Sequence, residues 1–302
     1  MAHVVGPTLR AESLTKRFGR AVTAVEDLSF TVEPGRVTGF LGPNGSGKTT
    51  TLRCMLGLVR PTSGRATIDG KAYAELDDPM RRVGGALEAS GFHPGRTGRN
   101  HLRVLTAAGG LPDSRADEVL EFVGLAQAAR RRIAEYSLGM RQRLALAAAL
   151  VGEPGALVLD EPANGLDPEG IAWLRTFLRA RAAEGATVLV SSHALAEVQQ
   201  TVDDVVIINH GQLIHSGPLG ELASRHTSRV IVRSPDADAL MTALREAGAS
   251  TEARTDGSWL VAGVTAEQVG HAARVGGHEL HQLSPEPDAL ERMFLDMTGG
   301  AE

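Results

Sequence analysis

One stretch decides the fold of this 302-residue chain: Gly42-Pro43-Asn44-Gly45-Ser46-Gly47-Lys48-Thr49. It matches the pattern G-x-x-x-x-G-K-[ST] in full, between a predicted buried strand at 37–41 and a predicted helix from about 48 to 58. The glycines let successive backbone N–H groups converge on one anion, and the helix N-terminus adds partial positive charge. Lys48 would neutralise the β- and γ-phosphates, and the Thr49 hydroxyl would hold Mg²⁺. The stretch predicts a nucleotide-binding phosphate loop, but kinases, GTPases and motor ATPases share this loop, so the reaction stays open.

Two adjacent acids follow the apolar run Ala156–Leu159. A buried strand that ends in Asp160 places the carboxylate at the carboxyl edge of a parallel sheet, where ligands of open α/β sheets bind. Asp160 is therefore predicted to hold Mg²⁺, directly or through water. Glu161 points elsewhere, because strand neighbours alternate faces, and it is placed to orient or deprotonate an attacking water. The alternative is an acidic turn that only caps the strand.

Strands and helices alternate around these two motifs, which predicts an α/β fold with a parallel sheet covered by helices. Short β patterns precede the phosphate loop, and residues 98–152 are predicted to be mostly helical. The later strands and helices are predicted at 156–159, 170–183, 187–191, 194–201 and 205–209.

The alternation restarts past about residue 225. Strands are predicted near 230–232, 259–261 and 278–283, with helices at 236–247, 266–275 and 287–297. This restarted alternation of strands and helices is compatible with a small ferredoxin-like module. We therefore expect two domains, residues 1–225 and a small α+β accessory domain at 226–302.

Charge and composition limit the partners. The formal net charge is −5, and residues 226–302 alone hold six arginines and twelve acids. Because no basic surface dominates, nucleic acid is not an expected partner. The single cysteine, Cys54, excludes an internal disulfide framework and fits a reducing compartment. No apolar run reaches the roughly 20 residues of a spanning helix, and the first residues do not read as a signal peptide. We therefore expect a cytoplasmic protein that reaches a membrane only through a partner.

A second motif is more specific than the phosphate loop. The stretch Tyr136-Ser137-Leu138-Gly139-Met140-Arg141-Gln142-Arg143 resembles the signature of ATP-binding cassette (ABC) proteins, L-S-G-G-Q followed by R-Q-R. Ser137 can cap the helix that is predicted to run to about Val151. In that family the helix end binds the γ-phosphate held by the opposite subunit, which is anion binding at a helix N-terminus. The first, third and fifth residues of the stretch depart from the family pattern.

Further motifs follow in the order of that family. Asp167, within Asn164–Pro168, resembles the residue that links the two ATP sites, and His193 resembles the switch that contacts the γ-phosphate. Phe18 lies where the family keeps an aromatic residue that stacks on adenine. Glu88 lies where the family usually has a glutamine that contacts Mg²⁺ and relays ATP binding to the membrane subunit. Three of these residues have a plainer alternative: a structural histidine for His193, a core phenylalanine beside a turn for Phe18, and a misaligned loop for Glu88.

The resemblance, which covers about residues 8–225, implies a P-loop NTPase of the ABC cassette type. Such a cassette has a mostly parallel sheet, an antiparallel β-subdomain and a helical subdomain. It implies ATP and Mg²⁺ as cofactors and an ATPase reaction. The implied catalytic residues are Lys48, Glu161 and His193; the implied Mg²⁺ ligands are Thr49, Asp160 and Glu88; and the implied ATP contacts are Phe18, Gly42, Pro43, Asn44, Gly45, Ser46, Gly47, Lys48, Thr49, Thr50, Ser137, Gly139 and Asp167.

The function implied by the resemblance is the ATPase subunit of an exporter. Some exporters of lantibiotics, bacitracin-like peptides and related drugs are similar in their signature and in the Glu88 position. The implied partners are a separate integral-membrane permease and a second copy in an ATP-dependent homodimer. Two alternatives are a soluble ABC-type regulator of another macromolecule and a P-loop kinase or GTPase. The first usually carries two cassettes, and the second leaves Ser137–Arg143 and His193 without a role.

Overall fold

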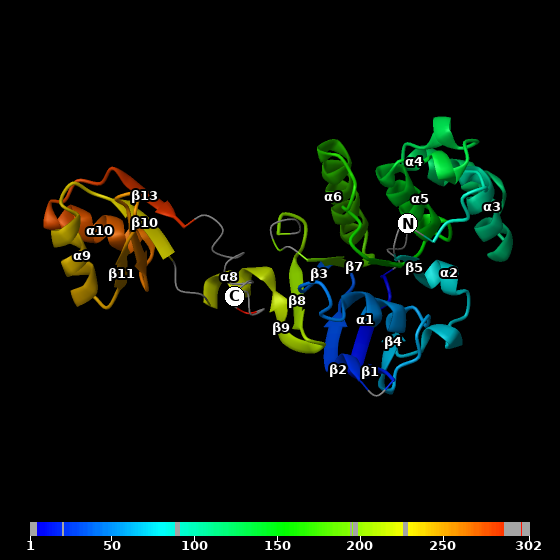
Figure 1. Cartoon of the computed structure of the whole chain (residues 1–302), viewed down its shortest axis with the longest axis horizontal. Helices are drawn as coiled ribbons and strands as arrows, with labels where there is room; N and C mark the ends of the chain where they lie inside the picture. Colours follow the sequence, from blue (N-terminus) through cyan, green and yellow to red (C-terminus); the bar gives the residue numbers. More distant parts are fainter. Residues whose placement is uncertain are drawn as a thin grey trace. The chain divides into compact units, whose positions relative to one another are not determined.

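The computed structural model describes residues 5–19, 21–87, 91–193, 195, 199–225, 229–286 and 297. The chain forms two compact units, residues 1–219 and 220–302, each described by itself below (Figure 1). The Glu88 position and most of the helix expected at 287–297 lie outside the described residues. Among the described residues, no helix is both long and apolar enough to cross a membrane.

A six-stranded sheet forms the centre of the first unit. All its strands are parallel except the last, which runs antiparallel to its neighbour. The central strands are buried at every position, as expected for a sheet covered on both faces. The strands, in spatial order, are β5 (Val83–Ala86), β6 (Ala156–Leu159), β7 (Thr187–Ser192), β3 (Val37–Leu41), β8 (Asp204–Asn209) and β9 (Gln212–Pro218).

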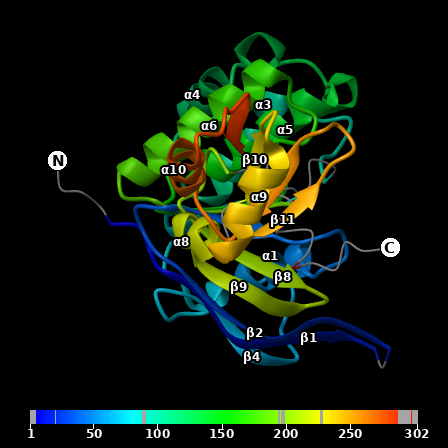
Figure 2. The same ribbon diagram turned by 90° about the vertical axis from the view of Figure 1, so that its left-hand side faces the viewer.

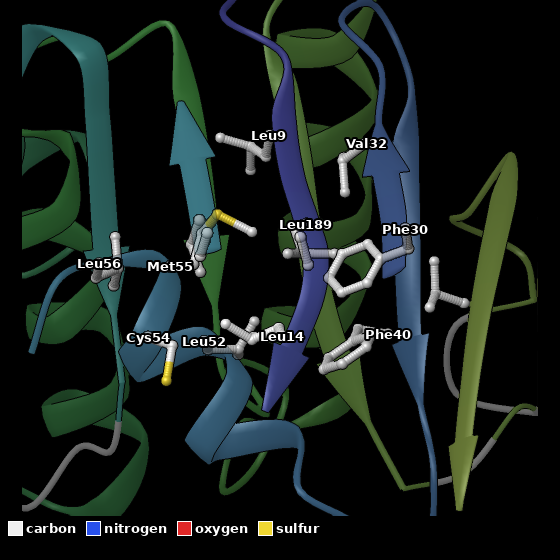
Figure 3. Close-up of a cluster of buried hydrophobic side chains, with 14 of the residues drawn as sticks. Leu9, Leu14, Phe30, Val32, Phe40, Leu52, Cys54, Met55, Leu56 and Leu189 are labelled. Atoms are coloured by element: carbon white, nitrogen blue, oxygen red, sulfur yellow. The ribbon is translucent and has the colours of Figure 1, made fainter. Parts of the chain in front are cut away.

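An antiparallel sheet and helix α1 (Lys48–Met55) cover one face of the central sheet. The strands are β2 (Val22–Val32), β1 (Leu9–Phe18) and β4 (Ser63–Ile68), in that order. Figure 3 shows their apolar side chains packed against α1 and the central sheet. The rings of Phe30 and Phe40 are stacked, with their centroids 5.2 Å apart. Cys54 lies in this core as a free, buried thiol.

Helices cover the other face. Figures 1 and 2 both show these helices on the side of the central sheet opposite α1. Leu157 points toward this side, because its strand neighbours Ala156 and Val158 belong to the α1 core, and Val188 does so because the next residue, Leu189, belongs to that core. The helices are α3 (Gly98–Ala108), α4 (Ser114–Phe122), α5 (Leu138–Leu150) and α6 (Pro168–Ala183), whereas the short helix α2 (Pro79–Arg82) directly precedes β5.

The second unit has its own small core between two helices and one face of an antiparallel sheet. Its elements follow a β-α-β-β-α-β order, which is that of ferredoxin-like modules. The spatial strand order is β11-β12-β10-β13. After α8 (Leu219–Arg225) the elements are β10 (Arg229–Arg233), α9 (Ala237–Glu246), β11 (Ser250–Ala253), β12 (Trp259–Ala262), α10 (Ala266–Gly276) and β13 (Gln282–Pro285).

Three local differences from the sequence predictions have physical reasons. Helix α1 ends at Met55 rather than near residue 58, because Gly57 adopts a left-handed conformation that stops the helix. Strands β9 and β11 were not predicted, because each lies at a sheet edge and carries mostly exposed side chains. An edge strand of this kind lacks the apolar pattern that identifies a buried strand.

Candidate active site

The phosphate loop connects β3 to α1 at the carboxyl edge of the central sheet. Lys48 turns back into the loop, and its Nζ donates to the carbonyl oxygens of Gly42 at 2.6 Å and Pro43 at 3.2 Å. Gly47 has a φ of 103°, and a Cβ there would lie 2.3 Å from the Ala24 carbonyl oxygen. Only glycine fits this position, which closes the loop and starts the helix.

The Lys48 ammonium lies in a low-dielectric position. Burial lowers its pKa, while the carboxylates of Glu161 and Asp160 act in the opposite direction. A phosphate bound in the loop would favour the charged form of this ammonium. The lysine is therefore suited to neutralise an anionic ligand.

Thr49 and Asp160 meet as the two motifs predict. The Thr49 hydroxyl donates to Oδ2 of Asp160 at 2.7 Å, which joins the first turn of α1 to the end of β6. These are hard oxygen donors, and Mg²⁺ commonly binds one or two protein oxygens together with substrate phosphates. The residues present therefore fit the ion. The third expected ligand, Glu88, lies outside the described residues.

Glu161 lies between two cationic or titratable groups. Its Oε2 is 3.0 Å from Nδ1 of His193, and its Oε1 is 3.7 Å from Nζ of Lys48. The three residues that the sequence assigns to catalysis thus come together from α1, the end of β6 and the end of β7. This arrangement can polarise a water beside a phosphate held in the loop.

The signature residues form a separate group. Ser137 caps α5 by accepting from the Met140 N–H at 3.2 Å, as its sequence position predicts. A Cβ at Gly139 would lie 2.7 Å from the Gly165 carbonyl oxygen, so this turn touches the loop after β6. Asp167 caps α6 by accepting from the Gly170 N–H at 2.9 Å. In the described parts of the chain, no hydrogen bond or ion pair joins these residues to the phosphate loop.

The remaining expected ATP contacts have varied surroundings. Phe18 ends β1 and is 48% exposed, with Nζ of Lys16 lying 4.9 Å from its ring centroid. Asn44 and Gly45 are exposed at the tip of the phosphate loop, whereas Ser46 is buried and Thr50 is half-buried. An exposed aromatic ring can stack on a base, but the assignment of Phe18 stays a prediction.

Two polar side chains without a predicted role also contact the acids. Ser191 is hydrogen-bonded to both Asp160 and Glu161, and Gln142 donates to the Glu161 carbonyl oxygen. Gln142 belongs to the signature stretch, and Ser191 is the last residue of the strand predicted at 187–191. The sequence feature that could have identified them is a polar residue in an otherwise apolar strand or helix, since such residues are rarely buried without a hydrogen-bond partner.

Comparison with known proteins bears on both units. The ABC transporter family matches residues 25–164, and a domain of unknown function (DUF8746) matches residues 228–291. The bacitracin transport ATP-binding protein BcrA of Bacillus licheniformis is 41% identical over 221 residues, which are 72% of this chain and 72% of that protein.

Two further likenesses extend this result. The Nod factor export ATP-binding protein I of Ralstonia nicotianae is 35% identical over 310 residues, covering 97% of this chain and 94% of that protein. The solved structure of the ATP-binding subunit of an ABC transporter matches with a TM-score of 0.65 at 28% identity, over 72% of this chain and 92% of that one. The first of these likenesses spans both compact units.

Proposed function

The chain belongs to the ATP-binding proteins of ABC transporters, and from this premise we propose that it powers export through a separate membrane permease. The activity of the family is ATP hydrolysis. The main support for the catalytic roles proposed below is the position of the Glu161 carboxylate, which lies between Nδ1 of His193 and Nζ of Lys48. A carboxylate so placed can accept a proton from water beside the γ-phosphate.

The proposed reaction within the site follows from these contacts. Lys48 and the loop amides bind the phosphates. Thr49 and Asp160 would hold Mg²⁺, which would supply positive charge to the phosphates when bound. The water oxygen forms a bond to the γ-phosphorus while the bond to the ADP oxygen breaks. The water proton passes to Glu161, and His193 keeps that carboxylate oriented.

The geometry of the signature supports a composite site. Ser137 and Gly139 lie at the N-terminus of α5, which carries partial positive charge, and Ser137 is exposed. We propose that this helix end binds the γ-phosphate in the loop of a second copy, so that ATP joins two chains head to tail. Asp167, at the exposed start of α6, would lie near the same junction.

A groove next to the site supports docking of the permease. It lies between β5, α3 and α5, and Glu88, the predicted coupling residue, directly follows its lining residue Leu87 in the sequence. Its lining is largely apolar, with Leu87, Phe92 and Leu105 among its side chains. We propose that a cytoplasmic segment of the permease binds here, which would hold the subunit at the membrane.

The Glu88 assignment has its own test. A Glu88→Gln substitution should leave nucleotide affinity within several-fold while changing the amount of substrate exported per ATP. The measurement is transport and ATP hydrolysis by the assembled transporter in vesicles. If transport and hydrolysis change in strict proportion, Glu88 is not a coupling residue.

The proposed cargo is a drug or an antimicrobial peptide. The support is the likeness to a bacitracin transport ATP-binding protein, although a Nod factor export protein is also similar. A strain that lacks this chain should become more sensitive to bacitracin-like peptides, and the wild-type chain, but not its Glu161→Gln variant, should restore resistance. Unchanged susceptibility to every peptide and drug in a panel would contradict this cargo.

Co-purification with a membrane chain tests the proposed permease separately.

A further inference from the structure

The backbone of Glu161 has an unusual conformation. Its φ is 46°, in the left-handed region that residues with a Cβ rarely occupy. Such a conformation persists only where surrounding contacts hold it, and it is often found at active sites. The contacts of the two peptide groups of Glu161 therefore indicate what keeps its carboxylate in place.

Ser191 holds the first peptide group. Its Oγ accepts from the Glu161 N–H at 2.9 Å and donates to Oδ1 of Asp160 at 2.5 Å. The side chain is 1% exposed and belongs to β7, two residues before His193. One hydroxyl thus joins the main chain of Glu161, the carboxylate expected at Mg²⁺ and the strand that directly precedes His193.

Gln142 holds the second peptide group. Its Nε2 donates to the Glu161 carbonyl oxygen at 3.3 Å, and the same oxygen accepts from the Asn164 N–H at 3.1 Å. Gln142 is buried in α5, the helix that Ser137 caps. Because the carbonyl has two partners, we expect Gln142 to matter less than Ser191.

We infer that Ser191, assisted by Gln142, is a positioning residue that keeps Glu161 in its left-handed conformation, with the carboxylate between Lys48 and His193. Neither side chain contacts the reacting atoms. The inference rests on the role proposed for Glu161, which the Glu161→Gln variant tests independently. If Glu161→Gln hydrolyses ATP at the wild-type rate, the proposed role itself fails, whatever Ser191 does.

The main test is Ser191→Ala, which removes both hydrogen bonds without adding volume. We expect kcat for ATP hydrolysis at saturating Mg²⁺ to fall by about tenfold to a hundredfold, since misplacement of a catalytic group has effects of this size. KM for ATP, and the affinity for a fluorescent ATP analogue measured with and without Mg²⁺, should stay within about threefold, because the phosphate loop is unchanged.

The matched control is Thr187→Val in the same strand. Thr187 is also buried, and its hydroxyl donates to the Pro7 carbonyl oxygen at 2.7 Å, away from the site. This variant should lose thermal stability comparably to Ser191→Ala but keep the wild-type kcat. Ser191→Thr retains the hydroxyl and should recover most of kcat; if its extra methyl group prevents folding, the comparison of Ser191→Ala with Thr187→Val still decides.

Three results would overturn the inference: a wild-type kcat in Ser191→Ala, an equal loss of kcat in Thr187→Val, or full recovery of Ser191→Ala at high Mg²⁺. The last would mean that the hydroxyl acts only through Asp160. In support, Gln142→Met should lower kcat by a smaller factor. Combined with Ser191→Ala it should lower kcat by less than the product of the single effects, because both residues act on Glu161.

Discussion

The two compact units alternate strands and helices in similar ways but differ in strand direction. In residues 1–219, β3, β6 and β7 are parallel, so their carboxyl ends meet at one edge and bring Lys48, Asp160, Glu161 and His193 together. In residues 220–302 every strand pair of the described sheet is antiparallel, so neighbouring strands end at opposite edges. The difference shows that the catalytic residues come together because parallel strands end at a shared edge, and not merely because strands and helices alternate.

Among the tests of this difference between the units, Glu161→Gln at the shared edge is expected to have the largest effect on ATP hydrolysis. ATP hydrolysis should fall by about 100- to 10,000-fold, the usual contribution of a general base, whereas ATP should still bind and trap a dimer. The measurements are single-turnover hydrolysis and size-exclusion chromatography with ATP. The control is Glu153→Gln, because Glu153 also has a positive φ, 51°, but lies outside the site. Equal hydrolysis by the two variants would contradict the assigned role.

Replacement of Lys48 is expected to have the next largest effect. Lys48→Met should weaken ATP binding by about tenfold to a hundredfold, the range for a lost charge-assisted hydrogen bond. In the wild-type protein, burial lowers the pKa of Lys48 from its ordinary 10.5. ATP affinity should therefore be constant below that lowered pKa and fall as pH rises through it.

Binding titrations from neutral to alkaline pH test both statements. Lys71→Met is the control, since Lys71 is exposed and paired with Asp77. If Lys48→Met shows the same alkaline loss of affinity as the wild type, the titrating group is not Lys48.

A cavity made in the core of each unit should show that only the first unit supports ATP hydrolysis. Leu52→Ala in α1 and Leu240→Ala in α9 each remove a fully buried leucine side chain. Each should lower the free energy of unfolding of its own unit by about 2–5 kcal/mol. Only Leu52→Ala should also lower ATP hydrolysis, because α1 carries Lys48 and Thr49. Calorimetry measures the loss of stability, and hydrolysis assays measure the loss of activity. Equal losses of ATP hydrolysis in the two variants would contradict the assignment of the chemistry to the first unit alone.

The smallest effect is expected at Asp256 in the second unit. Its carboxylate accepts from the hydroxyl and N–H of Ser258 and from Arg233, and these hydrogen bonds hold its pKa well below the ordinary 3.8. A lowered pKa in the folded state stabilises the unit above pH 3.8, and this contribution is lost as pH falls further.

Asp256→Asn should therefore slightly lower the thermal stability of the second unit at neutral pH, remove part of its acid sensitivity, and leave hydrolysis unchanged. Asp238→Asn, on an exposed turn of α9, is the control. An unchanged acid transition in Asp256→Asn would show that other groups govern it.

The part of the site that the sequence predicts is encoded locally. Lys48 and Thr49 belong to one contiguous motif, and Asp160 and Glu161 follow directly from an apolar strand. The contacts of Ser191 and Gln142 were not predictable in this way, because each joins residues at least 19 positions apart through a single hydrogen bond. Only the folded sheet edge brings them together. The same holds for β11, whose four polar or small residues pair with β12 through backbone groups.

The position of the only cysteine has a practical consequence for experiments on assembly. Cys54 is buried behind the phosphate loop in α1, and burial raises the pKa of its thiol. A buried thiol with a raised pKa reacts slowly with maleimides and other thiol-directed labels. A cysteine introduced at an exposed site such as Leu138 would therefore be labelled selectively in an otherwise wild-type chain. Fluorophores or spin probes placed there could follow the approach of two subunits during ATP turnover without removing the native thiol.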